Sequence, residues 1–106
     1  MFARVVRIPL KPEGRDVHTR ALESEIMPIL KKFPGFTGEV NLVSTDNKEA
    51  IGISLWESKE YADEYDRKGY AEVSKVMERY AAGKPEVRTF EVTHWSVEKV
   101  TARKAA

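Results

Sequence analysis

The sequence contains no cysteine and only two histidines, His18 and His94. The absence of cysteine excludes disulfides, thiolate catalysis, cysteine-ligated zinc and iron–sulfur clusters. Two histidines are a sparse supply of metal ligands. We therefore expect neither a metal ion nor a cofactor.

Long apolar runs and a surplus of one charge are also lacking. The longest apolar runs are far shorter than the about 20 residues of a membrane helix, and no signal-peptide pattern is evident. We expect a cytoplasmic protein that does not bind membranes. The 18 basic and 17 acidic residues give a net charge of +1, so the sequence predicts no nucleic-acid partner. There is also neither a glycine-rich phosphate loop nor the nucleophile elbow of a serine hydrolase.

What is present is a regular alternation of apolar and polar residues. The predicted strands are Phe2–Leu10, Thr37–Ser44, Ala50–Trp56 and Val87–Val100. The predicted helices run from Gly14 to Phe33 and from Ser58 to about Gly83. Interruptions are expected at Met27–Pro28 and Lys68–Gly69, because proline and glycine weaken a helix interior.

The order β-α-β-β-α-β predicts one α+β domain over residues 1–100, followed by a flexible tail over residues 101–106. Two β-α-β halves form a ferredoxin-like sandwich, in which a four-stranded antiparallel sheet carries two helices on one face. Several strands also carry apolar residues on the other face, which a monomer would leave in water. We therefore expect a homodimer that pairs through this face of the sheet.

Two short motifs carry a resemblance to a known family. A helix ends in Phe33-Pro34-Gly35-Phe36, and Leu55-Trp56-Glu57-Ser58 opens the second helix after a hairpin. This arrangement resembles the antibiotic-biosynthesis-monooxygenase-like family over nearly the whole chain. The resemblance implies dimers whose sheets pair into an α/β barrel, with a pocket between the sheet and helices of each subunit. Members include cofactor-independent oxygenases of quinol-like or polyketide substrates, and heme-degrading enzymes.

The sequence departs from the heme-degrading branch at three positions. Val5-Val6-Arg7 stands where that branch has an asparagine, Tyr65 where it has a tryptophan, and Lys75 where it has the heme-ligating histidine. A protonated lysine is a poor iron ligand at neutral pH. Heme degradation by that mechanism is therefore not expected.

His94 is the candidate catalytic base. It lies on the last predicted strand beside apolar residues, where an imidazole can take a proton from a phenol or hydroquinone near neutral pH. The alternative is a histidine that is hydrogen-bonded at the dimer interface. Trp56 and Tyr65 are candidates for a pocket that binds a small aromatic ligand, Trp56 as a flat wall and Tyr65 through its hydroxyl. Both residues also suit a packed core.

Arg4 and Arg7 lie three apart on the first strand, so they point to opposite faces of the sheet. One of them must face an apolar side, where it either holds an anionic group or pairs with a carboxylate such as Glu39 or Glu91. His18 is expected at the edge of the first helix's inward face, half exposed.

Two functions are compatible with these residues. One is a cofactor-independent monooxygenase, or a related oxidative enzyme, acting on a small aromatic or quinol-like molecule. The other is a non-catalytic dimer that binds a small ligand or assembles with a partner. Fold alone does not choose between them, because function belongs to sites.

Overall fold

A computed structural model describes residues 1–96 of the chain. Its sheet consists of β1 (Phe2–Pro9), β2 (Phe36–Val43), β3 (Glu49–Trp56) and β4 (Glu86–Glu91). The first helical segment is made of α1 (Gly14–Ala21), the π-helical turn η1 (Leu22–Ile26) and α2 (Met27–Leu30). The second is made of α3 (Lys59–Lys68) and α4 (Tyr70–Met77). Within residues 1–96, no helix combines the length and apolar character needed to cross a membrane.

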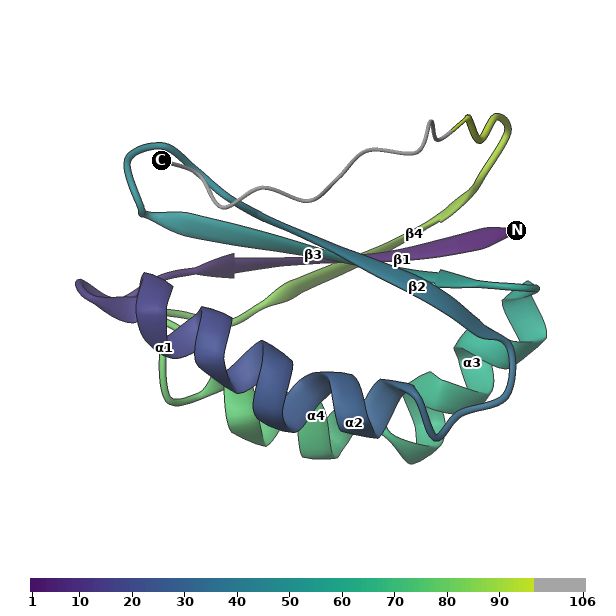
Figure 1. Ribbon diagram of the computed structural model, residues 1–106, viewed down its shortest axis with the longest axis horizontal. Coiled ribbons are helices and arrows are strands. Elements are labelled where there is room, and N and C mark those ends of the chain that lie inside the picture. Colours follow the sequence, from purple (N-terminus) through teal and green to yellow (C-terminus); the bar gives the residue numbers. More distant parts are fainter. Residues whose placement is uncertain (97–106) are drawn as a thin grey trace.

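The sheet has the strand order β2-β3-β1-β4, and all neighbouring strands are antiparallel. Both helical segments cover the same face of this sheet, and within residues 1–96 no helix lies on the opposite face (Figure 1). The ferredoxin-like α+β sandwich predicted from the sequence is confirmed. The predicted tail over residues 101–106, and the domain's end at residue 100, lie outside the described residues.

Each helical segment is interrupted near its predicted position. The π turn η1 precedes Pro28, whose ring nitrogen cannot donate a backbone hydrogen bond, and α-helix resumes at Met27. The second segment breaks at Gly69, where an added Cβ would lie 2.6 Å from the Phe33 ring. Ser58, where the second helix was predicted to begin, is the N-cap residue of α3, but its side chain makes no capping hydrogen bond.

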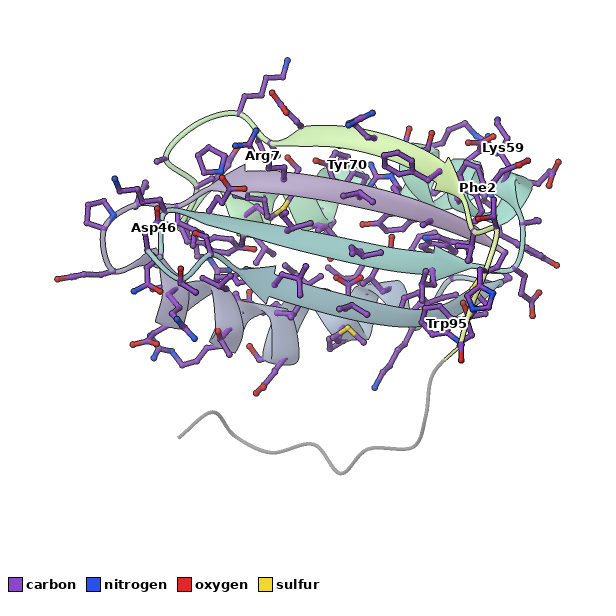
Figure 2. The ribbon with its side chains drawn as sticks, turned by 90° about the horizontal axis from the view of Figure 1, so that it is seen from above. Phe2, Arg7, Asp46, Lys59, Tyr70 and Trp95 are labelled. Atoms are coloured by element: carbon purple, nitrogen blue, oxygen red, sulfur yellow. The ribbon has the colours of Figure 1, made fainter. Side chains whose placement is uncertain are left out.

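The last strand is shorter than the sequence predicted. The alternation of apolar residues indicated a strand over Val87–Val100, whereas β4 ends at Glu91. The backbone amide of Val92 still bonds to the Met1 carbonyl at 2.9 Å. The chain then crosses the uncovered face of the sheet toward β2, where Trp95 lies (Figure 2). Residues 97–100 of the predicted strand lie outside the described residues.

Candidate functional site

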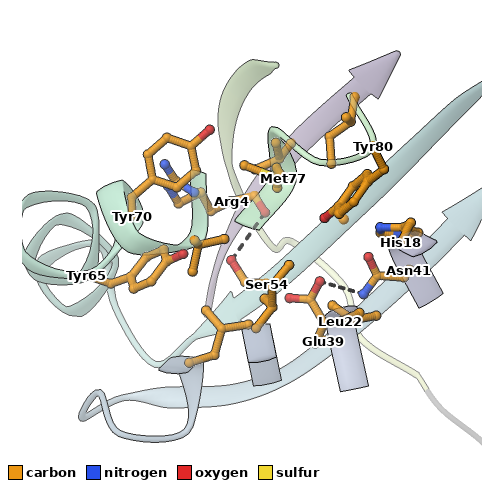
Figure 3. A pocket seen from close by; sticks show the side chains of 16 residues that line it. Arg4, His18, Leu22, Glu39, Asn41, Ser54, Tyr65, Tyr70, Met77 and Tyr80 are labelled. Atoms are coloured by element: carbon orange, nitrogen blue, oxygen red, sulfur yellow. Dashed lines mark hydrogen bonds between the residues drawn. The ribbon is translucent and has the colours of Figure 1, made fainter. Parts of the chain in front are cut away.

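A cavity with a volume of about 40 Å³ lies between the inner face of the sheet and the two helical segments. The sheet provides its floor, and each helical segment provides one wall (Figure 3). The floor residues are Arg4, Val6, Ile8, Glu39, Asn41, Gly52 and Ser54. The wall residues are His18, Leu22, Ile26 and Leu30 on one side, and Tyr65, Tyr70, Val73, Met77 and Tyr80 on the other.

Strand register places three polar side chains in one row across the floor. Glu39 of β2 is paired with Ser54 of β3, which in turn is paired with Arg4 of β1. Paired residues point to the same face of a sheet, so all three face the helices. With strands about 4.8 Å apart, the Cα atoms of Glu39 and Arg4 lie about 10 Å from each other. The row holds a carboxyl group and a guanidinium group with a hydroxyl between them.

Gly52 makes room for the acidic end of this row. A Cβ atom at Gly52 would lie 3.1 Å from Oδ1 of Asn41 and 3.3 Å from Oε2 of Glu39. Any larger residue would therefore press on both side chains. The absence of a side chain lets the carboxylate and the amide lie directly over β3.

Glu39 is the titratable group best suited to proton transfer. Burial raises the pKa of Glu39 to about 7, although the hydrogen bond from Asn41 and the charge of Arg4 both act to lower it. The Asn41 amide Nδ2 donates to Oε2 of Glu39 at 2.7 Å. A carboxyl with a pKa near the working pH is well matched to general acid–base catalysis.

Arg4 brings a buried positive charge to the other end of the row. Its side chain is 3% exposed, and Nη2 donates to Oδ1 of Asp66 at 2.7 Å. Its guanidinium lies 4.0 Å from the ring centroid of Tyr70 and 5.3 Å from that of Tyr65. Asp66 is 57% exposed, so the ion pair reaches from solvent into the cavity.

The two arginines of β1 face opposite sides of the sheet, as predicted, and Arg4 is the one in the cavity. Arg7 lies on the uncovered face and makes a bidentate pair with Glu49, at 3.0 and 2.9 Å. Neither arginine forms the ion pair that the sequence suggested with Glu39 or Glu91. The sequence did not predict Asp66 of α3 as the partner of Arg4, because its position beside β1 depends on how the helix packs.

Tyr65 lines the cavity, and Trp56 supports it from behind. The two rings stack with their centroids 5.0 Å apart and an interplanar angle of 24°. The indole Nε1 of Trp56 donates to Oγ of Ser54 at 2.9 Å, and Trp56 is fully buried. Trp56 is not among the cavity-lining residues. It acts as the core residue of the strand–helix junction and positions Ser54 and Tyr65.

His94 lies away from the cavity. It is exposed, in the segment that follows β4, and it is not among the cavity-lining residues. The reason is that β4 ends at Glu91, so the strand that was expected to carry His94 inward is not formed there. Within one chain, the structure does not bring His94 together with Tyr65 and Trp56.

His18, which was expected to be half exposed, is 2% exposed and lines the cavity. His18, Leu22, Ile26 and Leu30 follow one another at intervals of four residues. On a regular α-helix such residues drift around the axis, because a turn takes only 3.6 residues. The i→i+5 turn η1 takes in an extra residue and returns His18 to the inward face. The four-residue spacing was the sequence signal for this position.

The described part of the chain, residues 1–96, holds no group of three or more histidine, aspartate or glutamate side chains placed to bind a metal ion. The polar groups of the cavity are instead suited to organic ligands. They comprise a carboxyl, a guanidinium, an amide, hydroxyls and an imidazole on apolar walls.

Comparisons with known proteins yield matches in structure. No family model matches the sequence, and no curated protein matches it. A monooxygenase from the gene ActVA-Orf6 of Streptomyces coelicolor, solved with nanaomycin D, superposes with a TM-score of 0.75 at 17% identity over 92% of each chain. SnoaB, a cofactor-independent oxygenase from Streptomyces nogalater, superposes with a TM-score of 0.72 at 13% identity over 92% of this chain and 97% of that one.

The chain has the fold of the antibiotic-biosynthesis-monooxygenase-like family. Rv0793 from Mycobacterium tuberculosis shares it too, with a TM-score of 0.70 at 16% identity over 91% of this chain and 98% of that one. The resemblance read from the sequence is therefore confirmed for the fold. Because all these identities are low, the function of this protein has to be argued from its own cavity.

Proposed function

We propose that the protein is a monooxygenase that needs no cofactor and oxidises a small aromatic or quinol-like molecule in the inner cavity. The observation that carries the proposal is the row of half-buried Glu39 and buried Ser54 and Arg4, in which desolvation raises the pKa of Glu39 to about 7. The structural likeness to a cofactor-independent oxygenase supports the same reaction class. The base role passes from His94, the candidate chosen from sequence, to Glu39.

In the proposed reaction, Glu39 takes a proton from the CH₂ group of an anthrone-type substrate. Arg4 stabilises the negative charge of the resulting anion. The anion passes one electron to O₂, and the radical and superoxide combine to form a C–O bond. The peroxide takes the proton back from Glu39 and loses water. One oxygen atom remains in the product as a carbonyl, and the other leaves in the water.

Substrate binding requires the cavity to widen. An engineered protein cavity that binds benzene measures about 150 Å³, several times the roughly 40 Å³ present here. Met77 is an unbranched side chain that can move aside. Arg79 and Glu25 form an ion pair at the surface, between η1 and the end of the second helical segment. Separation of the two walls would break this pair.

Oxygen uptake with anthrone tests the proposal. We expect uptake by the wild-type protein, with ¹⁸O from labelled O₂ appearing in the product carbonyl. Glu39→Gln keeps the shape of the side chain and should lower kcat by about 10²–10⁴, the usual contribution of a general base. His94→Ala should leave the rate unchanged. The proposal fails if no oxygen is consumed, or if the rate depends on His94 and not on Glu39.

We also propose that two copies pair through the uncovered face of the sheet. Val40, Leu42 and Phe90 are 40%, 50% and 42% exposed on this face. They lie beside the half-buried Val5 of β1 and apolar residues of β3. A monomer would hold this apolar surface in water. Sedimentation should give twice the mass of the chain, and Leu42→Lys should give a single copy. A wild-type protein that sediments as a single copy at micromolar concentration would contradict the pairing.

A non-catalytic ligand-binding or assembly dimer is the second candidate function. The observation in its favour is the small volume of the cavity in the free protein. Such a protein would bind an aromatic ligand without consuming oxygen. The oxygen-uptake experiment and a binding titration therefore distinguish the two functions.

A further inference from the structure

One end of the cavity holds polar atoms that the proposed reaction does not use. His18 comes from α1 and Tyr80 follows α4, and their ring centroids lie 5.0 Å apart at an interplanar angle of 61°. They are 2% and 1% exposed. Within residues 1–96, neither ring nitrogen of His18 nor the hydroxyl of Tyr80 has a hydrogen-bond partner. Buried polar groups without partners are costly, so three in one place indicate a binding site.

This end lies away from the guanidinium of Arg4. His18 and Leu30 both line the cavity, and the 12 residues between them correspond to about 18 Å along a helix. Just beyond Leu30, Phe33 meets Tyr65 with ring centroids 5.3 Å apart, and Arg4 lies against Tyr65 as described above. The walls between the two ends are apolar (Figure 3), formed by Leu22, Ile26, Val73 and Met77. The cavity thus has apolar walls, with Arg4 at one end, His18 and Tyr80 at the other, and Glu39 and Asn41 on its floor.

We propose that His18 and Tyr80 form a second recognition subsite, which binds a neutral hydroxyl or carbonyl group at the far end of an elongated aromatic ligand. The inference rests on the proposed function and adds to it the shape of the ligand: oxygen substituents at both ends of a fused-ring system. A single-ring phenol would reach only one of the two polar ends.

The chemistry of the two side chains selects a neutral group. Burial lowers the pKa of His18 and raises the pKa of Tyr80, so both are uncharged near neutral pH. A neutral imidazole offers one donor and one acceptor, and a phenol offers both as well. A hydroxyl or a carbonyl can satisfy them. Neither side chain offers a charge of its own to balance a carboxylate or an ammonium group.

Calorimetric titration without oxygen tests this subsite separately from turnover. The matched probes are 2,6-dihydroxynaphthalene and 2-naphthol, which differ by one terminal hydroxyl. We expect the diol to bind about tenfold more tightly to the wild-type protein, a factor that corresponds to hydrogen bonds with otherwise unpaired groups. Tyr80→Phe should reduce this preference below about threefold and leave 2-naphthol unaffected. Tyr61→Phe, on α3 and outside the cavity lining, is the control.

Nitrogen NMR of the histidine rings provides a readout that needs no variant. The diol should shift the ring signals of His18, whereas 2-naphthol should not, and the exposed His94 serves as the internal reference. The subsite is overturned if both probes bind with equal affinity, or if Tyr80→Phe lowers the affinity for both probes equally. It is also overturned if the His18 signal does not move, or if neither probe binds. Oxygen uptake with anthrone that persists in those cases would leave the proposed reaction intact.

Discussion

The two faces of the sheet each depart from the usual relation between burial and polarity. The inner face, which the helices cover, carries Arg4, Ser54 and Glu39 in a row. The outer face, which no helix covers, exposes Val40 and Leu42. In an ordinary antiparallel sheet the covered face is apolar and the solvent face polar. Each departure has a cost, since charges are buried on one side and apolar surface is wet on the other.

The two costs have different explanations. Polar groups that face the helices are held where they can meet a ligand, because a row of fixed charges in a low-dielectric cavity acts strongly on bound molecules. Apolar residues on the outer face instead suit a second sheet. We therefore propose chemistry for the inner face and assembly for the outer one.

Arg4 and Arg7 offer the sharpest contrast between the faces, because they lie on the same strand. Arg4→Met should lower the free energy of unfolding by about 2–3 kcal/mol, through loss of the ion pair and of the contact with the Tyr70 ring. Arg7→Met removes a largely exposed pair with Glu49 and should cost much less. Urea denaturation of both variants measures the difference. Equal losses would mean that the two faces hold charge equally well.

Glu39→Gln should stabilise the protein, and the gain should grow with pH. The pKa of Glu39 is about 7 in the folded protein against an ordinary value of 4.5, so the folded state binds more protons than the unfolded state between those values. Wild-type stability therefore falls as pH rises from about 5 to about 8. The variant lacks this loss and should gain about 1–3 kcal/mol over wild type at pH 8, and little at pH 5. Parallel stability curves would contradict a buried carboxyl.

Gly52→Ala tests the acidic end of the row. The added methyl group would press on Asn41 and Glu39, and such overpacking typically costs about 1–2 kcal/mol. Oxygen uptake should fall as well, since the carboxylate is displaced. Gly38→Ala is the matched control in β2, because a Cβ there meets its nearest atom, on Leu55, only at 3.9 Å. Comparable effects of the two changes would remove the special role of Gly52.

Local patterns were sufficient for much of the fold. Alternation located β1, β2 and β3 within about one residue at each end, and Pro28 and Gly69 marked the helix interruptions. The last strand was overestimated because Val92, Thr93 and His94 continue the alternation. Periodicity does not show where pairing to a neighbouring strand stops.

The site was harder to predict, because its polar residues lie on the face of the sheet that the helices cover. Glu39 and Asn41 alternate with Val40 and Leu42, and such a pattern ordinarily places the polar residues in solvent. Alternation indicates which residues share a face, but not which face the helices cover. Tyr65 and Arg4 were predicted as pocket residues and line the cavity. Glu39 was considered only as an ion-pair partner.

Carbon NMR of the free protein can follow the carboxyl titration of Glu39, on which the proposed chemistry of the inner face depends. The inner face is a working site only if its carboxyl is poised to exchange a proton near neutral pH. We expect a midpoint near 7, which should rise in Arg4→Met because the charge of Arg4 lowers the pKa of Glu39. A midpoint at the ordinary value of 4.5, unchanged by that substitution, would show a solvated surface glutamate and rule out Glu39 as the base.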